Sequence, residues 1–398
     1  SVLKPRRTWT TFLNHYHQLV YNVRDSLTQQ WRKQMNNSAT QMYSLSLDQC
    51  VNAIMVNGAE RTILAQGHMG IGKSSMIKEL AKQLPNHIPC YFDCTTKDLG
   101  DIMIPKMAQL EDQNYVTFAT NEELGVHLNK PVIVMLDEFG KANPAVKNAL
   151  LRFMLERKVG SYELPEGSVV FATTNLGAEG VGDMLLPHQR DRIIPVKIRK
   201  PDHLEWIEWG INNDVHPSVL GFVKDFPAVM QTFEDVKDPT ENPYIYHPQL
   251  QREAFVTPRG LHGASDILHK RHLVDDHTLT ALLMGTIGDQ AAMDMMAFVK
   301  LADQLPSLDS IKNDPNNAKV PESASATCMV VYRSLASMEK DWINAWMDYM
   351  PRLNKEAQGM FVNGARNPKY SKIDVVMSNA KFTQWAMDNT YMFTADKK

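Results

Sequence analysis

The sequence predicts an α/β protein in which a parallel five-stranded sheet is followed by a purely helical region. Between residues 45 and 200, five short apolar segments alternate with amphipathic helical patterns. This order is typical of a parallel sheet covered by helices on both faces. After Pro201 the strand patterns stop and only helical patterns follow. A chain of 398 residues is long enough for two or three such domains.

Strands are expected at residues 62–66, 87–93, 131–136, 168–175 and 192–198. The third, PVIVML, is almost wholly apolar, as expected of a central strand buried on both faces. One helix is expected over residues 74–84, and another begins with Asn143 as its cap and Pro144 in its first turn. Further helical patterns cover residues 203–211, 218–226, 260–270, 278–305 and about 325–390.

These patterns divide the chain into four parts. We expect a helical segment over 1–44, a nucleotide-binding core over 45–200, a helical lid over 201–275 and a C-terminal helical region over 276–398. The net charge of −3 gives no general indication of nucleic-acid binding. Residues 1–36 are basic, and they form either a solvated helix face or a contact with phosphates or an acidic neighbour.

Four cysteines in a chain this long do not form a disulfide framework. Cys90 and Cys94 have no second pair, which argues against a zinc site and favours packing as small apolar side chains. No apolar run approaches the length of a membrane span, and the first residues lack the apolar segment of a signal peptide. We therefore expect a cytoplasmic protein without membrane contact.

The stretch GHMGIGKSS, residues 67–75, has the spacing of a phosphate-binding loop. Its glycines allow backbone N–H groups to point at phosphate oxygens, and the helix that follows adds its positive end. Lys73 is expected to reach the β- and γ-phosphates of ATP, and Ser74 to ligate Mg²⁺. ATP or ADP should therefore contact the whole loop, which consists of Gly67, His68, Met69, Gly70, Ile71, Gly72, Lys73, Ser74 and Ser75.

Two acidic residues follow the apolar strand 131–136. Asp137 is the second expected Mg²⁺ ligand, and Glu138 is the candidate general base for an attacking water. Asn175 ends the next strand and could orient that water, with Thr174 as the neighbouring alternative and a simple turn as the other interpretation of Asn175.

Three arginines complete the candidate catalytic set. Arg190 and Arg192 could reach the γ-phosphate of a neighbouring subunit and stabilise its developing charge. Arg259 lies just inside a helix start, where the helix dipole does not favour a cation. That position suggests a contact with the nucleotide, although a surface salt bridge is the alternative.

This set of motifs resembles the AAA+ ATPases and, within them, the MoxR-like branch. The resemblance covers about residues 45–275 and is densest from PVIVMLDEF to FATTNL. It implies that residues 67–74 form Walker A, that Asp137 and Glu138 form Walker B, and that Asn175 is sensor 1. It implies that Arg192 is the arginine finger, with Arg190 as a second candidate, and that Arg259 is sensor 2. It also implies a homo-oligomeric ring, a hexamer, that binds ATP between subunits.

The resemblance includes two inserts and two departures. Residues 98–118 look like the family's helix-2 insert, and residues 158–167 look like its hairpin before sensor 1. In this branch such hairpins face the pore or the substrate. The family usually has proline after the first glycine of Walker A, where this chain has His68 followed by Met69. The family also usually has threonine after the lysine, where this chain has Ser74, which keeps the hydroxyl. Because backbone groups hold most of the phosphate, we expect binding to survive.

The resulting hypothesis is an ATP-driven machine that remodels a protein client, beside a partner with a von Willebrand A domain. A nucleic-acid motor is possible but not favoured, because the first insert is not basic and no DNA-binding module is evident. The third hypothesis is a scaffold that binds nucleotide without hydrolysing it. Glu138 and Arg192 argue against it, because a pure binder needs neither.

Overall fold

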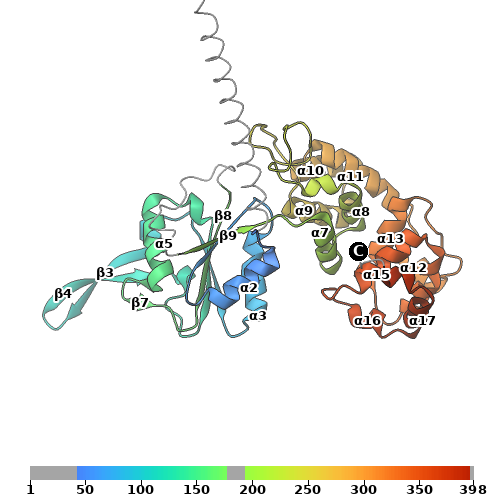
Figure 1. Ribbon diagram of the computed structural model, residues 1–398. Coiled ribbons are helices and arrows are strands. Elements are labelled where there is room, and N and C mark those ends of the chain that lie inside the picture. The colour runs from blue at the N-terminus through green and yellow to red at the C-terminus, as the bar shows by residue number, and fades with distance from the viewer. Residues whose placement is uncertain (1–42, 177–192, 395–398) are drawn as a thin grey trace, which may run out of the picture.

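The computed structural model of the chain describes residues 43–176 and 193–394. Within them, a sheet-containing core lies beside a purely helical region, and an extended connection after strand β9 joins the two (Figure 1). The predicted N-terminal helical segment and its basic arm lie almost wholly outside the described residues.

The core contains a five-stranded sheet in the order β2-β5-β8-β1-β9, and every strand pair in it is parallel. The strands are β1 (Ile63–Gly67), β2 (Ile88–Asp93), β5 (Val132–Asp137), β8 (Val169–Thr174) and β9 (Ile194–Ile198). All six residues of β5 are buried, as the apolar sequence predicts. The parallel five-stranded sheet and the α/β class are thus confirmed.

Helices cover both faces of this sheet (Figure 1). Helix α5 (Pro144–Glu156) begins at the predicted cap, where the Asn143 side chain accepts from the Val146 N–H. Its apolar side packs on the face formed by Val134, Leu136 and their neighbours. Helices α2 (Leu47–Asn57) and α3 (Met76–Gln83) pack on the opposite face. The helix expected from residue 74 begins instead as the 3-10 turn η1 (Lys73–Ser75).

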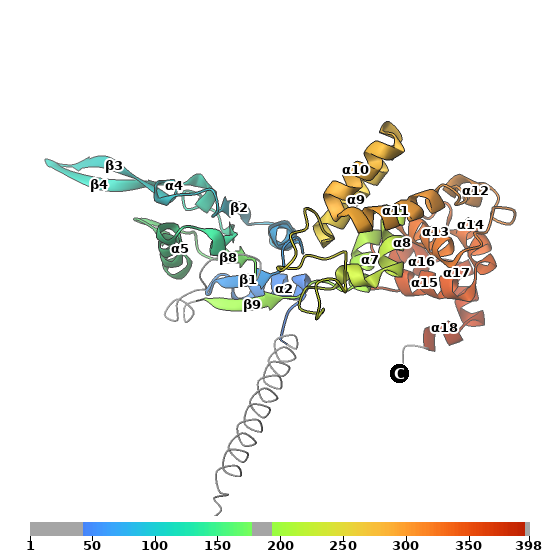
Figure 2. The same ribbon diagram turned by 90° about the horizontal axis from the view of Figure 1, so that it is seen from above.

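Two β-hairpins extend from the core. The first follows the short helix α4 (Leu99–Ile102), pairs β3 (Met103–Leu110) with β4 (Gln113–Thr120), and projects far from the rest of the molecule (Figure 2). The turn η2 (Glu122–Leu124) leads from it back to the core. The second pairs β6 (Lys158–Val159) with β7 (Tyr162–Glu163) between α5 and β8. Both expected inserts are therefore hairpins.

Past residue 200 the described chain is helical. Its elements are α7 (His203–Asn212), α8 (Pro217–Asp225), η5 (Pro227–Met230), α9 (Pro258–His269), η6 (Arg271–Leu273), α10 (Asp276–Ile287), α11 (Asp289–Ala302), α12 (Leu308–Asn313), α13 (Ala324–Ser337), α14 (Ile343–Tyr349), η7 (Met350–Arg352), α15 (Lys355–Ala365), α16 (Ile373–Met377), α17 (Ala380–Asp388) and α18 (Tyr391–Thr394). One apolar cluster runs through this region from Trp206 to Phe382. The boundary between lid and C-terminal region at residue 275 stays a prediction.

The four cysteines are free and buried. Cys90 and Cys94 pack in the apolar cluster on the α5 face of the sheet, which confirms their expected role as small apolar side chains. Burial raises the pKa of both thiols, so they stay protonated and unreactive. Among the helices of the described residues, each is too short or too polar to cross a bilayer.

Candidate active site

The phosphate-binding loop lies where β1 meets the 3-10 turn η1. Gly70 and Gly72 have φ angles of 70° and 103°, the left-handed region that glycine enters without strain. Lys73 is buried, and its Nζ donates to the carbonyl oxygens of Gly67 and His68 at 2.8 Å each. The same Nζ donates to Asn175 Oδ1 at 2.7 Å. The loop lysine and the predicted sensor residue are therefore in direct contact.

Asp137 accepts hydrogen bonds on both carboxylate oxygens. Its Oδ2 accepts from Ser74 Oγ and from the hydroxyl of Tyr91, each at 2.9 Å. Its Oδ1 accepts from Thr173 Oγ1 and, at 3.1 Å, from the Glu138 N–H. Burial, together with the hydrogen bond to Asp137, raises the pKa of Tyr91, so the phenol remains a donor.

The pairing of Ser74 with Asp137 fits a magnesium site. The Ser74 hydroxyl and the Asp137 carboxylate meet at 2.9 Å beside the phosphate loop. Mg²⁺ prefers oxygen ligands of this kind, and beside a nucleotide it takes few protein ligands because phosphates and water supply the rest. In residues 43–176 and 193–394 no group of three or more His, Cys, Asp or Glu side chains could form a separate metal cage.

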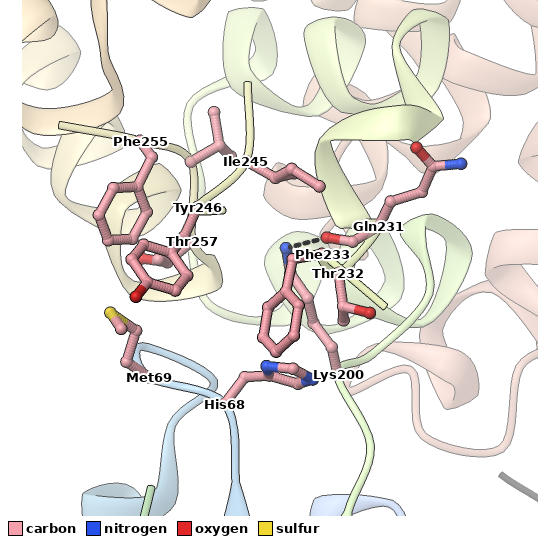
Figure 3. A pocket seen from close by; sticks show the side chains of 11 residues that line it. His68, Met69, Lys200, Gln231, Thr232, Phe233, Ile245, Tyr246, Phe255 and Thr257 are labelled. Atoms are coloured by element: carbon pink, nitrogen blue, oxygen red, sulfur yellow. Dashed lines mark hydrogen bonds between the residues drawn. The ribbon is translucent and has the colours of Figure 1, made fainter. Parts of the chain in front are cut away.

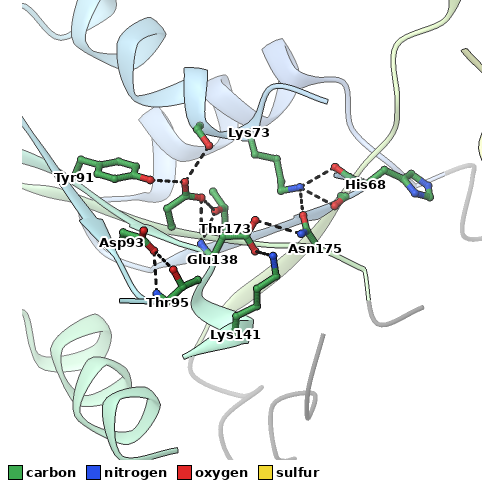
Figure 4. A network of polar contacts seen from close by, with 12 residues as sticks. His68, Lys73, Tyr91, Asp93, Thr95, Glu138, Lys141, Thr173 and Asn175 are labelled. Atoms are coloured by element: carbon green, nitrogen blue, oxygen red, sulfur yellow. Dashed lines mark hydrogen bonds and ion pairs between the residues drawn. The ribbon is translucent and has the colours of Figure 1, made fainter. Parts of the chain in front are cut away.

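Glu138 is held by contacts on both sides of its carboxylate (Figure 4). Its backbone is left-handed, with a φ of 52°, and its N–H also donates to Thr173 Oγ1 at 3.2 Å. Oε1 accepts from Asn175 Nδ2 at 3.2 Å, and Oε2 lies 3.2 Å from Lys141 Nζ. The predicted base and the predicted sensor residue are thus adjacent, as expected of side chains at the same edge of a parallel sheet.

These residues line one cavity of about 250 Å³. Its walls are Met69, Gly70, Lys73, Ser74, Glu138, Lys141, Asn175 and Arg259. Residues predicted from four separate stretches of sequence are therefore brought together. Arg259 comes from the first turn of α9, and its backbone N–H donates to the Gly70 carbonyl at 2.9 Å. The predicted lid is thereby hydrogen-bonded to the phosphate loop itself.

The other predicted loop residues lie beside this cavity. Gly67 ends β1, and the Ile71 side chain is buried in the apolar cluster under the sheet. Ser75 Oγ donates to the Gly72 carbonyl at 2.6 Å and so closes the loop. Arg190 and Arg192 lie outside the described residues, and their roles stay predictions.

His68 and Met69, which replace the family's common residues in the loop, face a separate aromatic cluster (Figure 3). The His68 ring meets the Phe233 ring edge-on at 5.5 Å, and the Tyr246 and Phe255 rings lie nearby, tilted by 54° with centroids 5.2 Å apart. They line a small, half-open space of about 30 Å³. Unlike the family's usual proline, these side chains can anchor the connection between η5 and α9 to the loop.

Gly70→Ala should disturb this junction. A Cβ on Gly70 would lie 2.6 Å from the Thr257 side chain, in a backbone region that costs an L-residue about 1–2 kcal/mol. We expect nucleotide affinity to fall about tenfold in an equilibrium binding titration, because the loop and Arg259 separate.

Gly167→Ala is the matched control for this prediction. Gly167 also has a positive φ, but a Cβ there would meet nothing within 4 Å. That variant should lose stability without losing nucleotide affinity. Equal affinities for the two variants would show that docking of the lid on Gly70 does not matter for binding.

Sequence reasoning missed three residues of the site, namely Tyr91, Lys141 and Thr173. Tyr91 lies on β2, which pairs with β5 so that Asp93 stands opposite Asp137. A prediction that these two strands are neighbours would have placed Tyr91 near Asp137. Lys141 lies three residues after Glu138, the spacing at which side chains meet within one helical turn. Thr173 precedes the predicted sensor by two positions.

Residues 62–178 match a protein family described as the AAA domain (dynein-related subfamily). The comparison with curated proteins finds no match.

Solved structures with similar folds include a proposed ATPase from Cytophaga hutchinsonii, with 14% identity over 86% of this chain and 94% of that chain and a TM-score of 0.32. They also include the RuvB Holliday junction branch migration motor of Thermotoga maritima, with 14% identity over 75% of this chain and 84% of that chain and a TM-score of 0.32.

Proposed function

We propose that this chain, a member of the AAA+ ATPases by the match of residues 62–178, hydrolyses ATP to ADP and phosphate with Mg²⁺. As a MoxR-like motor, it would use this reaction to remodel a protein. The observation that carries the proposal is the single cavity in which Lys73, Glu138, Asn175 and Arg259 meet. Phosphate contact, proton acceptance and water orientation are thereby available at one place.

Each residue has a distinct chemical role in this proposal. Lys73 Nζ would donate to the β- and γ-phosphates in place of the carbonyl oxygens of Gly67 and His68. Ser74 and Asp137 would hold Mg²⁺, which supplies charge neutralisation between those phosphates when it is bound. Glu138 accepts the proton of the attacking water while Asn175 Nδ2 orients the reacting groups. Arg259 adds a positive charge from the lid, so its contribution depends on the lid position.

Assembly would complete the site. The proposal places Arg192, or Arg190, of one subunit beside the nucleotide of the next, in a homo-oligomeric ring of the hexameric type. It further includes a partner with a von Willebrand A domain. The ring rests on the resemblance to the MoxR-like branch and on the match of residues 62–178, whereas the partner rests on the resemblance alone.

The β3–β4 hairpin favours a protein client over nucleic acid. Exposed apolar side chains cover both of its faces, with Ile104, Met107, Leu110, Tyr115 and Val116 all exposed. Exposed apolar side chains grouped in this way mark protein contacts. The charged residues of the hairpin are Lys106, Glu111 and Asp112, a balance that does not attract phosphate backbones. Phe118 lies against Gly160, so the two hairpins touch.

The client class is tested by the effect of polymers on ATP turnover. A permanently unfolded polypeptide should stimulate phosphate release, and duplex DNA at low salt should not bind. Met107→Thr with Val116→Thr replaces one cross-strand pair, whose members are 67% and 55% exposed, and keeps strand-favouring residues. This double variant should weaken the response to the polypeptide about tenfold while basal turnover stays unchanged.

Leu273→Thr is the control, because Leu273 is 70% exposed but lies on the helical region. It should respond like the parent. If the double variant also responds like the parent, the hairpin does not contact the client. Stimulation by DNA rather than by the polypeptide would contradict the proposed client class.

A further inference from the structure

Lys141 is a cation in the cavity that the roles above do not use. It ends the 3-10 turn η3 (Phe139–Lys141), which the left-handed backbone of Glu138 opens. The turn brings Lys141 Nζ back to 3.2 Å from Glu138 Oε2, and the lysine lines the same cavity as Lys73 and Arg259. Its ammonium therefore pairs with the carboxylate oxygen that Asn175 does not contact (Figure 4).

The polar side chains form a continuous row from Lys73 through Asn175 and Glu138 to Lys141. Lys73 and Asn175 both have a second task once a triphosphate enters, because the lysine donates to phosphate and the amide to the reacting groups. Among these side chains, Lys141 is given no contact with the nucleotide that would compete with its ion pair to Glu138. It ends the short turn that Glu138 opens, so one stretch of backbone positions both side chains.

We propose that Lys141 is a positioning residue that holds the Glu138 carboxylate toward the γ-phosphate while Lys73 and Asn175 engage the nucleotide. This role rests on the proposed ATPase activity. A general base contributes only when its acceptor oxygen lies within hydrogen-bond reach of the water, and a small displacement lowers the rate strongly. Asn175 donates to one oxygen of Glu138 and Lys141 forms an ion pair with the other, so the Lys141 pair is the contact that remains once Asn175 engages the nucleotide.

The competing explanation is an ordinary surface ion pair, which contributes little. The chain contains a suitable reference, since Lys82 pairs with Glu79 at the same distance of 3.2 Å and the same spacing of three residues. Lys82 lies in the last turn of α3, with 74% of its side chain exposed, against 41% for Lys141. Only the Lys141 pair borders the cavity.

The experiment compares Lys141→Met, Lys141→Arg and Lys82→Met with the parent chain in kcat, KM and equilibrium ATP affinity. Lys141→Met should lower kcat about five- to twentyfold, a part of the usual contribution of a general base, and leave ATP affinity within about twofold. Lys141→Arg keeps the charge and should retain most of kcat. Lys82→Met should match the parent in all three quantities.

Three results would overturn this role. A kcat of Lys141→Met equal to that of Lys82→Met would make the Lys141 pair an ordinary surface contact. A loss of ATP affinity with kcat retained would make Lys141 a phosphate ligand instead. A loss of kcat that arginine does not restore, accompanied by a lower melting temperature, would indicate a structural role. A parent chain without ATP turnover would contradict the proposed function itself, which separates the two failures.

Discussion

Lys73→Met should weaken ATP binding by roughly 30- to 1000-fold, since it removes about 2–4 kcal/mol of charge-assisted contact with the phosphates. Lys73 Nζ lies in the bend of the phosphate loop, held by two loop carbonyls and Asn175, where the β- and γ-phosphates are expected to bind. Methionine keeps the length of the side chain without its charge. Equilibrium titration with a fluorescent ATP analogue measures the change.

Lys82→Met is again the control, because it removes a lysine from the exposed end of the helix that follows the loop. It should bind ATP like the parent. Both variants should retain the cooperative melting of the parent, although Lys73→Met loses three hydrogen bonds. Unchanged ATP affinity in a folded Lys73→Met protein would show that the nucleotide does not bind at this loop.

Glu138→Gln should lower ATP turnover by about 10²- to 10⁴-fold and leave ATP binding intact. The amide has the same shape and can still accept from Asn175 Nδ2 through its oxygen, but it cannot take a proton from water. Phosphate release and ATP affinity, measured on the same preparation, separate the two effects. The variant should therefore hold ATP without consuming it.

Glu79→Gln is the matched substitution, since Glu79 is another lysine-paired glutamate and lies outside the cavity. It should hydrolyse ATP at the rate of the parent. Turnover by Glu138→Gln at the parent's rate would remove Glu138 from the catalytic role and leave Asp137 or a residue outside the described ranges as the base.

The sheet and most of the cavity could be predicted because both follow from local patterns. The run PVIVML identifies a strand buried on both faces, and the spacing of the glycines with Lys73 identifies the phosphate loop. Parallel strands end at one sheet edge, so residues that follow β1, β5 and β8 had to meet there. The contacts of Lys73, Glu138 and Asn175 are the direct result.

What the sequence could not predict depends on contacts between distant segments. Tyr91 reaches Asp137 only because β2 pairs with β5, and neither residue indicates that register alone. His68 was expected merely to be tolerated, yet it packs against Phe233, more than 160 residues away in the sequence. The docking of Arg259 on Gly70 likewise depends on how the helical region folds back.

The most direct test of the proposed ATPase is phosphate release per chain from Mg²⁺ and ATP, measured over a wide range of protein concentration with Glu138→Gln in parallel. A neighbour-supplied arginine predicts turnover per chain that rises as chains assemble, that disappears without Mg²⁺, and that stays near zero in the Glu138→Gln variant. Phosphate release no higher than that of Glu138→Gln at every concentration would contradict ATP hydrolysis at this site.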